Sequence, residues 1–189
     1  SNSAVLFENS NVEIDTFRKT LSSGWNFVSF PIAGTSSPDV SSVLGDTSNV
    51  NAVWKYTSDG WESWTPSSSN EDDFSTVSGG EGYLVDVDTG YTIDPNVNNV
   101  QTTQAPAQVQ ISEGYNLVGH LEEFHQDADA GDTSGAFASL DNSFWKVSEQ
   151  TSGLQVQETS ASDGIKTGSA YWVQTQGDLS DGSIAYTAN

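Results

Sequence analysis

Short apolar segments alternate with polar and glycine-rich turns along most of the chain. Residues 24–28 read Gly-Trp-Asn-Phe-Val and carry large side chains on both alternating faces, which is typical of a strand covered on both sides. Residues 53–56 and 61–64 flank a Ser-Asp-Gly turn and predict a β-hairpin. Residues 83–87 and 91–93 follow glycine-containing turns and predict further strands. The pattern therefore predicts a mostly β fold.

Two segments depart from the strand pattern and predict short helices. Residues 37–44 begin with a Ser-Pro pair and place apolar residues at positions i, i+3 and i+4, so we expect a helix that ends near Gly45. Residues 134–140 form its counterpart later in the chain. Near the N-terminus, residues 5–7 and 12–17 predict one or two additional strands.

Three sequence blocks recur in the same order in the second half of the chain. The matching pairs are 21–29 with 111–119, 53–56 with 144–147, and 77–85 with 165–173, at offsets of 90, 91 and 88 residues. Ordered blocks at a nearly constant offset are improbable by chance, and they predict an internal duplication.

The duplication divides the chain into two units, which we expect to form one compact β-sandwich or barrel-like domain with pseudo-twofold symmetry and two short helices. The expected boundaries are an N-terminal strand segment at 1–19, a first unit at 20–94, a linker at 95–106 and a second unit at 107–189. Equivalent buried positions are expected for Trp25 and Tyr115, for Trp54 and Trp145, and for Tyr83 and Tyr171.

The charge of the chain narrows the possible partners. Its 189 residues include 26 acids against five Lys or Arg, for a formal net charge of −21. Such a surface repels phosphate backbones and anionic lipid, which argues against nucleic-acid and membrane-surface roles. The 6 Trp, 6 Tyr and 8 Phe argue for a packed fold rather than a disordered acidic chain. We interpret the acidic, lysine-poor composition as an adaptation to high salt.

Several chemistries are excluded by composition. The chain has no cysteine, so disulfides, thiolate metal sites and thiol nucleophiles are ruled out. It has no run of 18 apolar residues, so we expect no membrane insertion by this chain. The acids gather in clusters that we expect on loops and strand faces, at 71–73, 86–88, 122–123 and 127–132.

The repeated blocks resemble a tandem module of archaeal and bacterial secreted surface proteins, including S-layer-like and adhesin-like proteins. The resemblance is carried by residues 21–31, 54–61 and 80–85, which contain Gly-Trp-Asn-Phe-Val-Ser-Phe-Pro, Trp-Lys-Tyr with Gly-Trp, and Gly-Glu-Gly-Tyr-Leu-Val. The second unit departs from the pattern, because no Pro follows Gly119 and Ala170 stands in place of Gly82. The resemblance implies an architecture and an extracellular or cell-surface location, with no single activity.

Two residue patterns resemble catalytic motifs, but the spacing of their residues fits a structural role better. Asp88 and Asp132 each begin an Asp-Thr turn like that of aspartic proteases, but a spacing of 44 residues is about half the repeat offset. His120 and His125 stand at i, i+5, whereas a metalloprotease helix needs i, i+4. We therefore expect no enzymatic activity and no catalytic residues.

The segment Asp-Ala-Asp-Ala-Gly-Asp suggests a calcium loop, with Asp127, Asp129 and Asp132 as candidate ligands, because Ca²⁺ prefers clustered oxygen ligands. Ala138 stands where the bidentate Glu of such a loop belongs, so a solvated acidic loop is the favoured interpretation. Ca²⁺ is the one cofactor that the sequence suggests.

The candidate sugar-binding residues are Trp61, Trp64 and Tyr56, whose rings could stack on saccharides. Trp61 and Trp64 are separated by an odd number of positions, so on a regular strand they lie on opposite faces and one of them is expected in the core.

Together these features predict a non-catalytic structural or adhesive module of a surface or virion protein adapted to high salt. Its partners would be other surface or virion protein subunits or surface glycans. The alternative is a carbohydrate-binding module, and a hydrolase ranks behind both. An exposed aromatic platform favours sugar binding, whereas a deep cleft with convergent carboxylates favours an enzyme.

Overall fold

The computed structural model describes residues 17–32, 36–67, 72–102, 107–119, 124–125, 144–152, 155–158, 165–175 and 183–188. Side chains are described for 17–32, 36–67, 72–102, 109–119 and 167–173. Among the residues with described side chains, strands make up 46% and helices 9%, which confirms the mostly β fold. The strands expected at 5–7 and 12–16, the helix at 134–140 and the acidic loop at 127–132 lie outside the described residues.

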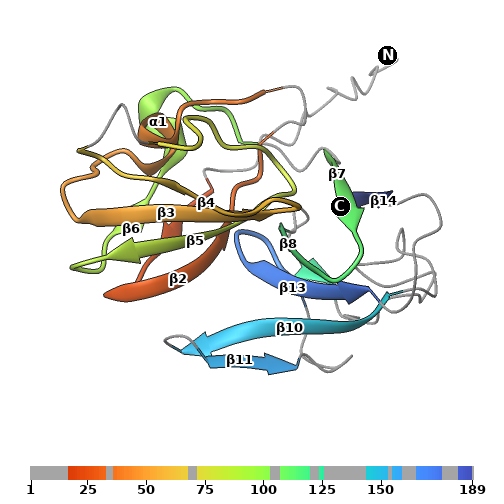
Figure 1. Cartoon of the computed structure of the whole chain (residues 1–189). Coiled ribbons are helices and arrows are strands. Elements are labelled where there is room, and N and C mark those ends of the chain that lie inside the picture. The colour runs from red at the N-terminus through yellow and green to blue at the C-terminus, as the bar shows by residue number, and fades with distance from the viewer. Residues whose placement is uncertain are drawn as a thin grey trace, which may run out of the picture.

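The first sheet is antiparallel and has the strand order β2-β5-β3-β4 (Figure 1). Its strands are β2 (Gly24–Ser29), β5 (Gly82–Val87), β3 (Val50–Thr57) and β4 (Gly60–Trp64). β3 and β4 form the expected hairpin, in which Thr57 pairs with Gly60 at the turn. A small ribbon of β1 (Lys19–Thr20) and β6 (Thr92–Ile93) accompanies this sheet.

The hydrophobic core lies against one face of the first sheet. Tyr83, Val85 and Val87 alternate along β5 and are buried together with Val53 and Trp64 of the neighbouring strands. The helix α1 (Val40–Leu44) lies beside the 3-10 helix η1 (Pro95–Asn98), which falls within the expected linker, and adds apolar side chains to this core (Figure 1).

The helix α1 begins later than the sequence pattern indicated. Asp39 is extended and forms an isolated bridge with Thr76, and the carbonyl of Pro38 accepts the N–H of Val77. Because these backbone groups pair with the neighbouring segment, residues 37–39 do not join the helix. The helix ends at Gly45 as expected, where the φ of 76° favours glycine.

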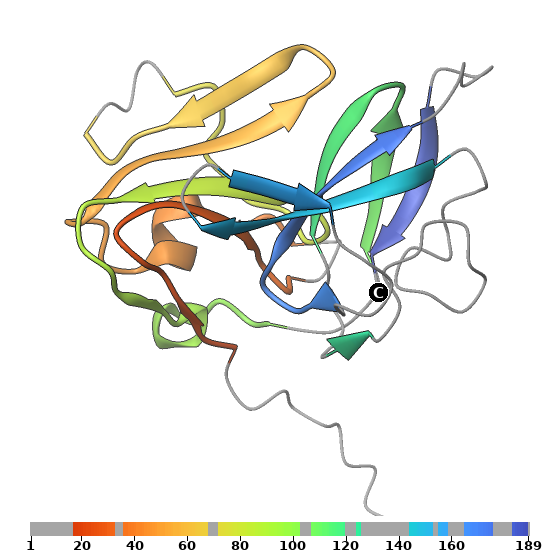
Figure 2. The ribbon, with the colours of Figure 1, turned by 90° about the horizontal axis from the view of Figure 1, so that it is seen from below.

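The second sheet has the order β11-β10-β13-β8. Its strands are β11 (Gln155–Glu158), β10 (Phe144–Ser152), β13 (Ala170–Thr175) and β8 (Tyr115–Gly119). Two short ribbons pair β7 (Ala107–Ser112) with β14 (Ser183–Ala188) and β9 (Phe124–His125) with β12 (Ile165–Lys166). The second sheet lies below the first in Figure 1 and crosses in front of it in Figure 2, and β8 and β13 contact β2 and β5.

The two sheets share their strand order and their register. The paired residues are Asn26 with Val85 and Val28 with Tyr83 in the first sheet, and Asn116 with Val173 and Val118 with Tyr171 in the second. An internal duplication requires such matching strand orders and registers, and the duplication itself stays a prediction.

Reciprocal backbone hydrogen bonds join the two sheets. The N–H of Ser29 donates to the carbonyl of Gly168 at 3.1 Å, and the N–H of Gly119 donates to the carbonyl of Gly80 at 2.8 Å. Gly119 follows Ser29 by 90 residues and Gly168 follows Gly80 by 88, which are the offsets of the repeated blocks. A pseudo-twofold axis between the two units would require such a reciprocal pair of bonds, and the axis itself stays a prediction.

The expected equivalence of Trp54 and Trp145 is wrong. Val53 pairs with Val85, and Val147 pairs with Val173, so β10 follows β3 by 94 residues rather than 91. Trp145 thus falls at a bulge in β10 that corresponds to the bulge at Asn51 in β3.

Of the other two expected pairs, one is buried at both positions and the other is not. Tyr83 and Tyr171 occupy matching register positions and are both fully buried. Trp25 and Tyr115 also match in register, but Trp25 is half-buried and Tyr115 is exposed, which corrects the expectation that both are core residues.

The repeated Ser-x-Gly-aromatic-Asn block has a local structural cause. In the first unit the Asn26 side chain accepts the N–H of Ser22 at 2.9 Å and donates to the carbonyl of Ser22 at 2.8 Å. Asn116 makes the same two bonds to Ser112. The intervening glycines have φ near +90°, a conformation that favours glycine at both positions.

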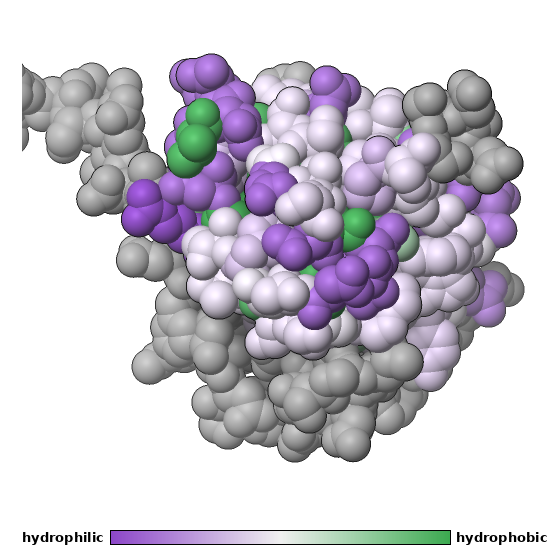
Figure 3. Space-filling model, turned by 90° about the vertical axis from the view of Figure 1, so that its left-hand side faces the viewer, coloured by the Kyte–Doolittle hydropathy of each residue, from purple (hydrophilic) through white to green (hydrophobic). Residues whose placement is uncertain are grey.

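The acids at 72 and 73 cover the edge strand β4. Asp73 accepts the N–H of Ser63 and Asp72 accepts the N–H of Thr65, each at 2.9 Å. These carboxylates occupy backbone donors that an open sheet edge would offer to another strand. Among the coloured residues of the left-hand face, residues of intermediate hydropathy and hydrophilic residues predominate, and apolar residues appear only as small separate areas (Figure 3).

Candidate functional site

Five aromatic side chains form a cluster where the two sheets meet. Trp172 of β13 lies at its centre, and the surrounding rings are those of Phe27, Tyr56, Trp61 and Tyr115. Their centroids lie 5.4 to 6.2 Å from that of Trp172, at interplanar angles of 71° to 88°. Edge-to-face contacts at these distances are favourable for aromatic pairs. We call these five residues the aromatic cluster.

The strand registers place these rings together. Tyr56 and Trp61 are directly opposite each other in the β3–β4 hairpin, with ring centroids 5.2 Å apart. Tyr115 begins β8 directly after the Gly114 turn, and Leu117 of that strand pairs with Trp172. The cluster therefore draws on both units, and its geometry depends on how the two sheets dock.

The cluster is partly open to solvent. Trp61 is 45% exposed and Tyr115 is 57% exposed, whereas the other three rings are half-buried. Of the three expected sugar-binding residues, the structure brings Tyr56 and Trp61 together. Trp64 is only 9% exposed and belongs to the hydrophobic core, so it does not contribute to this surface.

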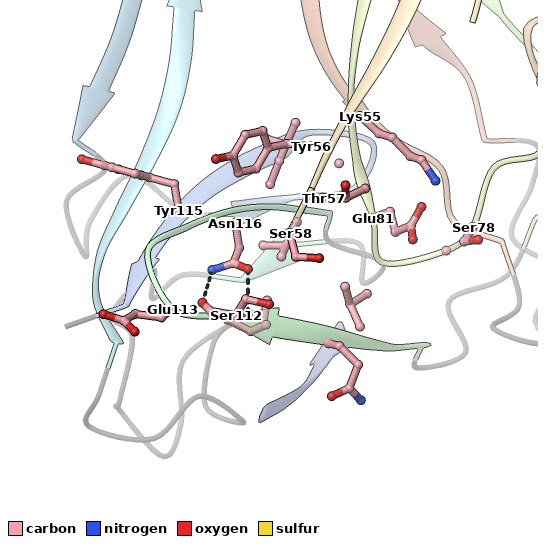
Figure 4. Close-up of a pocket in the computed structure, with 17 residues that line it drawn as sticks. Lys55, Tyr56, Thr57, Ser58, Ser78, Glu81, Ser112, Glu113, Tyr115 and Asn116 are labelled. Atoms are coloured by element: carbon pink, nitrogen blue, oxygen red, sulfur yellow. Dashed lines mark hydrogen bonds between the residues drawn. The ribbon is translucent and has the colours of Figure 1, made fainter. Parts of the chain in front are cut away.

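A cleft of about 510 Å³ adjoins the cluster (Figure 4). It lies between the end of β3, the glycine-rich turn before β5, and the segment formed by β7, β8 and the turn that connects them. Tyr56 and Tyr115 belong both to this cleft and to the aromatic cluster. We call it the interunit cleft. Its lining residues are Lys55, Tyr56, Thr57, Ser58, Ser78, Gly79, Glu81, Gly82, Val109, Gln110, Ile111, Ser112, Glu113, Tyr115, Asn116, Leu117 and Val118. The volume lies within the range of ordinary small-molecule sites.

A fixed carboxylate lies in one wall of the cleft. The Tyr83 hydroxyl donates to Glu81 Oε2 at 2.6 Å and accepts the N–H of Ser78 at 2.8 Å. Burial raises the pKa of Tyr83 well above its usual value, and the nearby charge of Glu81 adds to the shift. Tyr83 therefore keeps its proton and remains a donor to Glu81 at physiological pH.

The cation in the cleft already has a partner. Lys55 Nζ lies 3.1 Å from Glu62 Oε2 and 5.0 Å from the centroid of Phe74. The cleft lining also holds Glu81 and Glu113. With Lys55 neutralised by Glu62, the charge that a ligand meets in the described lining is negative.

The residues considered for catalysis are placed elsewhere or outside the described chain. Asp88 is exposed and accepts the Asn51 side-chain amide at 2.9 Å, which supports its interpretation as a turn residue. His125 pairs with Ile165 in a short ribbon, while His120 lies outside the described residues. The calcium candidates Asp127, Asp129 and Asp132 also lie outside them. Within the described part, no group of three or more His, Cys, Asp or Glu side chains is arranged to hold a metal ion.

Sequence reasoning missed Trp172, Tyr115 and Glu81 as site residues. A signal for Trp172 was present, because a Trp replaces Leu84 at the equivalent position of the second unit. A bulky aromatic residue there is explained by the docked aromatic side chains of the other sheet. Glu81 carried no comparable signal, since its partner Tyr83 was expected only as a core residue.

Comparison of the chain with protein-family models, with curated proteins and with solved structures finds no match. The resemblance to the tandem surface module therefore stays a prediction. Over the described ranges, no helix is both long enough and apolar enough to cross a bilayer.

Proposed function

We propose that this chain is a non-catalytic adhesive module that binds a saccharide at the aromatic cluster and the interunit cleft. The observation that carries the proposal is the position of the partly exposed rings of Trp61 and Tyr115 beside a polar cleft. A saccharide ring has apolar C–H faces, which pack on aromatic side chains. It also has hydroxyl groups, which need hydrogen-bond partners. The arrangement offers both.

The polar lining suits hydroxyl recognition. The walls of the cleft include the hydroxyl residues Thr57 and Ser58 and the carboxylate of Glu81. Most of the described lining residues carry polar side chains, which suits a ligand with many hydroxyl groups better than an apolar one. The opposing walls come from different units, so a bound saccharide would bridge them.

The absence of catalysis is part of the proposal. Its support is the structural use of the acid that most resembled a catalytic residue, since Asp88 is bonded to Asn51 at an exposed turn. A surface or virion location and adaptation to high salt are proposed with it. They rest on the net charge of −21 and on the resemblance of the repeated blocks to secreted surface modules.

The test is saccharide binding by the full chain and by two aromatic variants. Trp61→Ala and Tyr115→Ala remove exposed rings, so both variants are expected to fold. Neutral hexasaccharides of glucose, mannose and xylose serve as probes, measured by isothermal titration calorimetry. We expect at least one probe to bind and each variant to weaken it about tenfold, which corresponds to about 1.4 kcal/mol.

The control is Val97→Ala, which trims a residue that is 75% exposed on η1 and is not part of the aromatic cluster or the cleft lining. Its affinity is expected to match that of the original chain. Binding that survives both aromatic substitutions, or no binding of any probe at millimolar concentration, would contradict the proposal.

A further inference from the structure

Glu81 is held in place from two sides. Its side chain accepts the hydroxyl of the buried Tyr83, which in turn is held by the N–H of Ser78. Its backbone forms an antiparallel bridge with Val118 of the second unit. A carboxylate fixed in this way is preorganised, because binding does not have to order it.

One oxygen of this carboxylate is open to a ligand. Oε2 accepts the Tyr83 hydroxyl, and Oε1 has no hydrogen-bond partner in the described part of the chain. Figure 4 shows Glu81 beside Lys55 and Ser78 in one wall of the cleft, with Glu113 and Tyr115 in the opposite wall. Since Lys55 is paired with Glu62, the described lining offers no unpaired cation to an anionic ligand.

We propose that Glu81 determines the specificity of the cleft for uncharged saccharides: it accepts hydrogen bonds from hydroxyl groups and excludes saccharides that carry carboxylate or sulfate. This inference rests on the proposed function. A hydrogen bond to a charged acceptor is stronger than one to a neutral acceptor, which favours the hydroxyls of a neutral sugar. The same charge repels an anion, and less strongly in high salt because exposed charges are screened.

The test compares neutral hexasaccharides with an oligogalacturonate of the same length, by calorimetry in 0.15 M and 2 M NaCl. The original chain is expected to bind a neutral probe at least a hundredfold more tightly than the uronate in 0.15 M NaCl. Glu81→Gln keeps an acceptor for Tyr83 and removes the charge. It should weaken neutral binding about tenfold and narrow the ratio of neutral to uronate affinity at least tenfold.

Two further variants separate charge from general effects. Asp59→Asn removes one negative charge from the β3–β4 turn outside the cleft lining, and its Asn-Gly pair still suits a hairpin turn. It should leave the affinity ratio unchanged. Glu81→Asp keeps the charge but shortens the side chain, so it should weaken neutral binding while still excluding the uronate.

The outcomes are distinguishable. If the original chain binds the uronate as tightly as the neutral probe, or if Glu81→Gln leaves the ratio unchanged, the inference about Glu81 is wrong and the proposed function stands. If no saccharide of either class binds to the original chain, both are wrong.

Discussion

The contact between Ser29 and Gly119 offers a sharp test of how the two units dock. Ser29 Oγ donates to the carbonyl of Ser169 at 2.8 Å in a buried setting. A Cβ at Gly119 would overlap the Ser29 side chain and lie 2.9 Å from its Oγ, and it would also lie 2.9 Å from the carbonyl of Glu81. Ser169 follows Glu81 by 88 residues, so a serine at 119 would face the equivalent carbonyl.

The magnitudes follow from these contacts. Gly119→Ser alone overpacks an occupied site and should cost about 1–3 kcal/mol of unfolding free energy. Ser29→Gly alone loses a buried hydrogen bond, worth about 1 kcal/mol, and adds about 0.5–1 kcal/mol of backbone entropy. The exchange Ser29→Gly with Gly119→Ser removes the overlap with the Ser29 side chain and lets the new hydroxyl donate to the Glu81 carbonyl. The Glu81 carbonyl must still shift slightly, because it lies 2.9 Å from the new Cβ. We therefore expect the loss of unfolding free energy in the double variant to be about 1–3 kcal/mol smaller than the summed losses of the two single variants.

The assay is urea unfolding of the four proteins at fixed salt, followed by tryptophan fluorescence and by circular dichroism. As a matched control, Val97→Ala combined with Gly119→Ser should give additive costs, because residue 97 is not among the atoms near Gly119. Strict additivity in the Ser29 and Gly119 cycle would mean that the two positions do not share space, and the docking of the two sheets would then be wrong.

Other expectations concern single groups and salt. Burial raises the pKa of Tyr91 to about 12, with the charge of Asp46 adding to it, so the folded state holds this proton more tightly and stability should fall from about pH 10 toward pH 12. Tyr91→Phe should make that alkaline decline shallower. It should also raise the unfolding free energy at pH 7 by about 1 kcal/mol, because the buried Tyr91 hydroxyl has no hydrogen-bond partner in the described chain. An unchanged pH profile would contradict this expectation. Asp73→Ala should cost about 1 kcal/mol by freeing the Ser63 N–H, whereas Asp73→Asn should cost less; equal losses would contradict the role of an acceptor. Raising NaCl from 0.1 to 2 M should raise the melting temperature, and a flat response would contradict adaptation to salt.

Local patterns in the sequence predicted much of the first sheet. The hairpin turn, the strand β5 after its glycine-rich turn and the end of the helix at Gly45 each depend on residues within a few positions of one another. The start of α1 was misplaced because Asp39 pairs with the distant Thr76, a contact that no local pattern records.

The repeat predicted the common register, but not the details at the contact between units. The replacement of Gly82 by Ala170 in the second unit is explained by packing, because a Cβ at Gly82 would lie 2.9 Å from that of Ala170. Where one unit carries a side chain at this contact, the other has room only for glycine. The sequence comparison matched Trp145 to Trp54 by residue type, at an offset of 91 residues. The strand pairing gives an offset of 94 residues, so that match was three residues out of position.

The site was predictable only in part, since it is assembled by docking. Tyr56 and Trp61 are neighbours across one hairpin and were found from the sequence. Trp172 and Tyr115 reach them only through contacts between the two sheets. The acids at 72 and 73 were expected only as part of an acidic cluster on a loop or strand face, whereas they accept backbone N–H groups of β4.

The most direct test of saccharide binding at the aromatic cluster is a nuclear magnetic resonance titration that follows the tryptophan indole N–H signals. Trp61→Phe, Trp64→Phe and Trp172→Phe assign three of the six signals. On addition of a neutral hexasaccharide that binds, the Trp61 and Trp172 signals should shift with one common affinity, while the core Trp64 signal stays in place. Saturable binding that leaves Trp61 and Trp172 unmoved would contradict the proposed site.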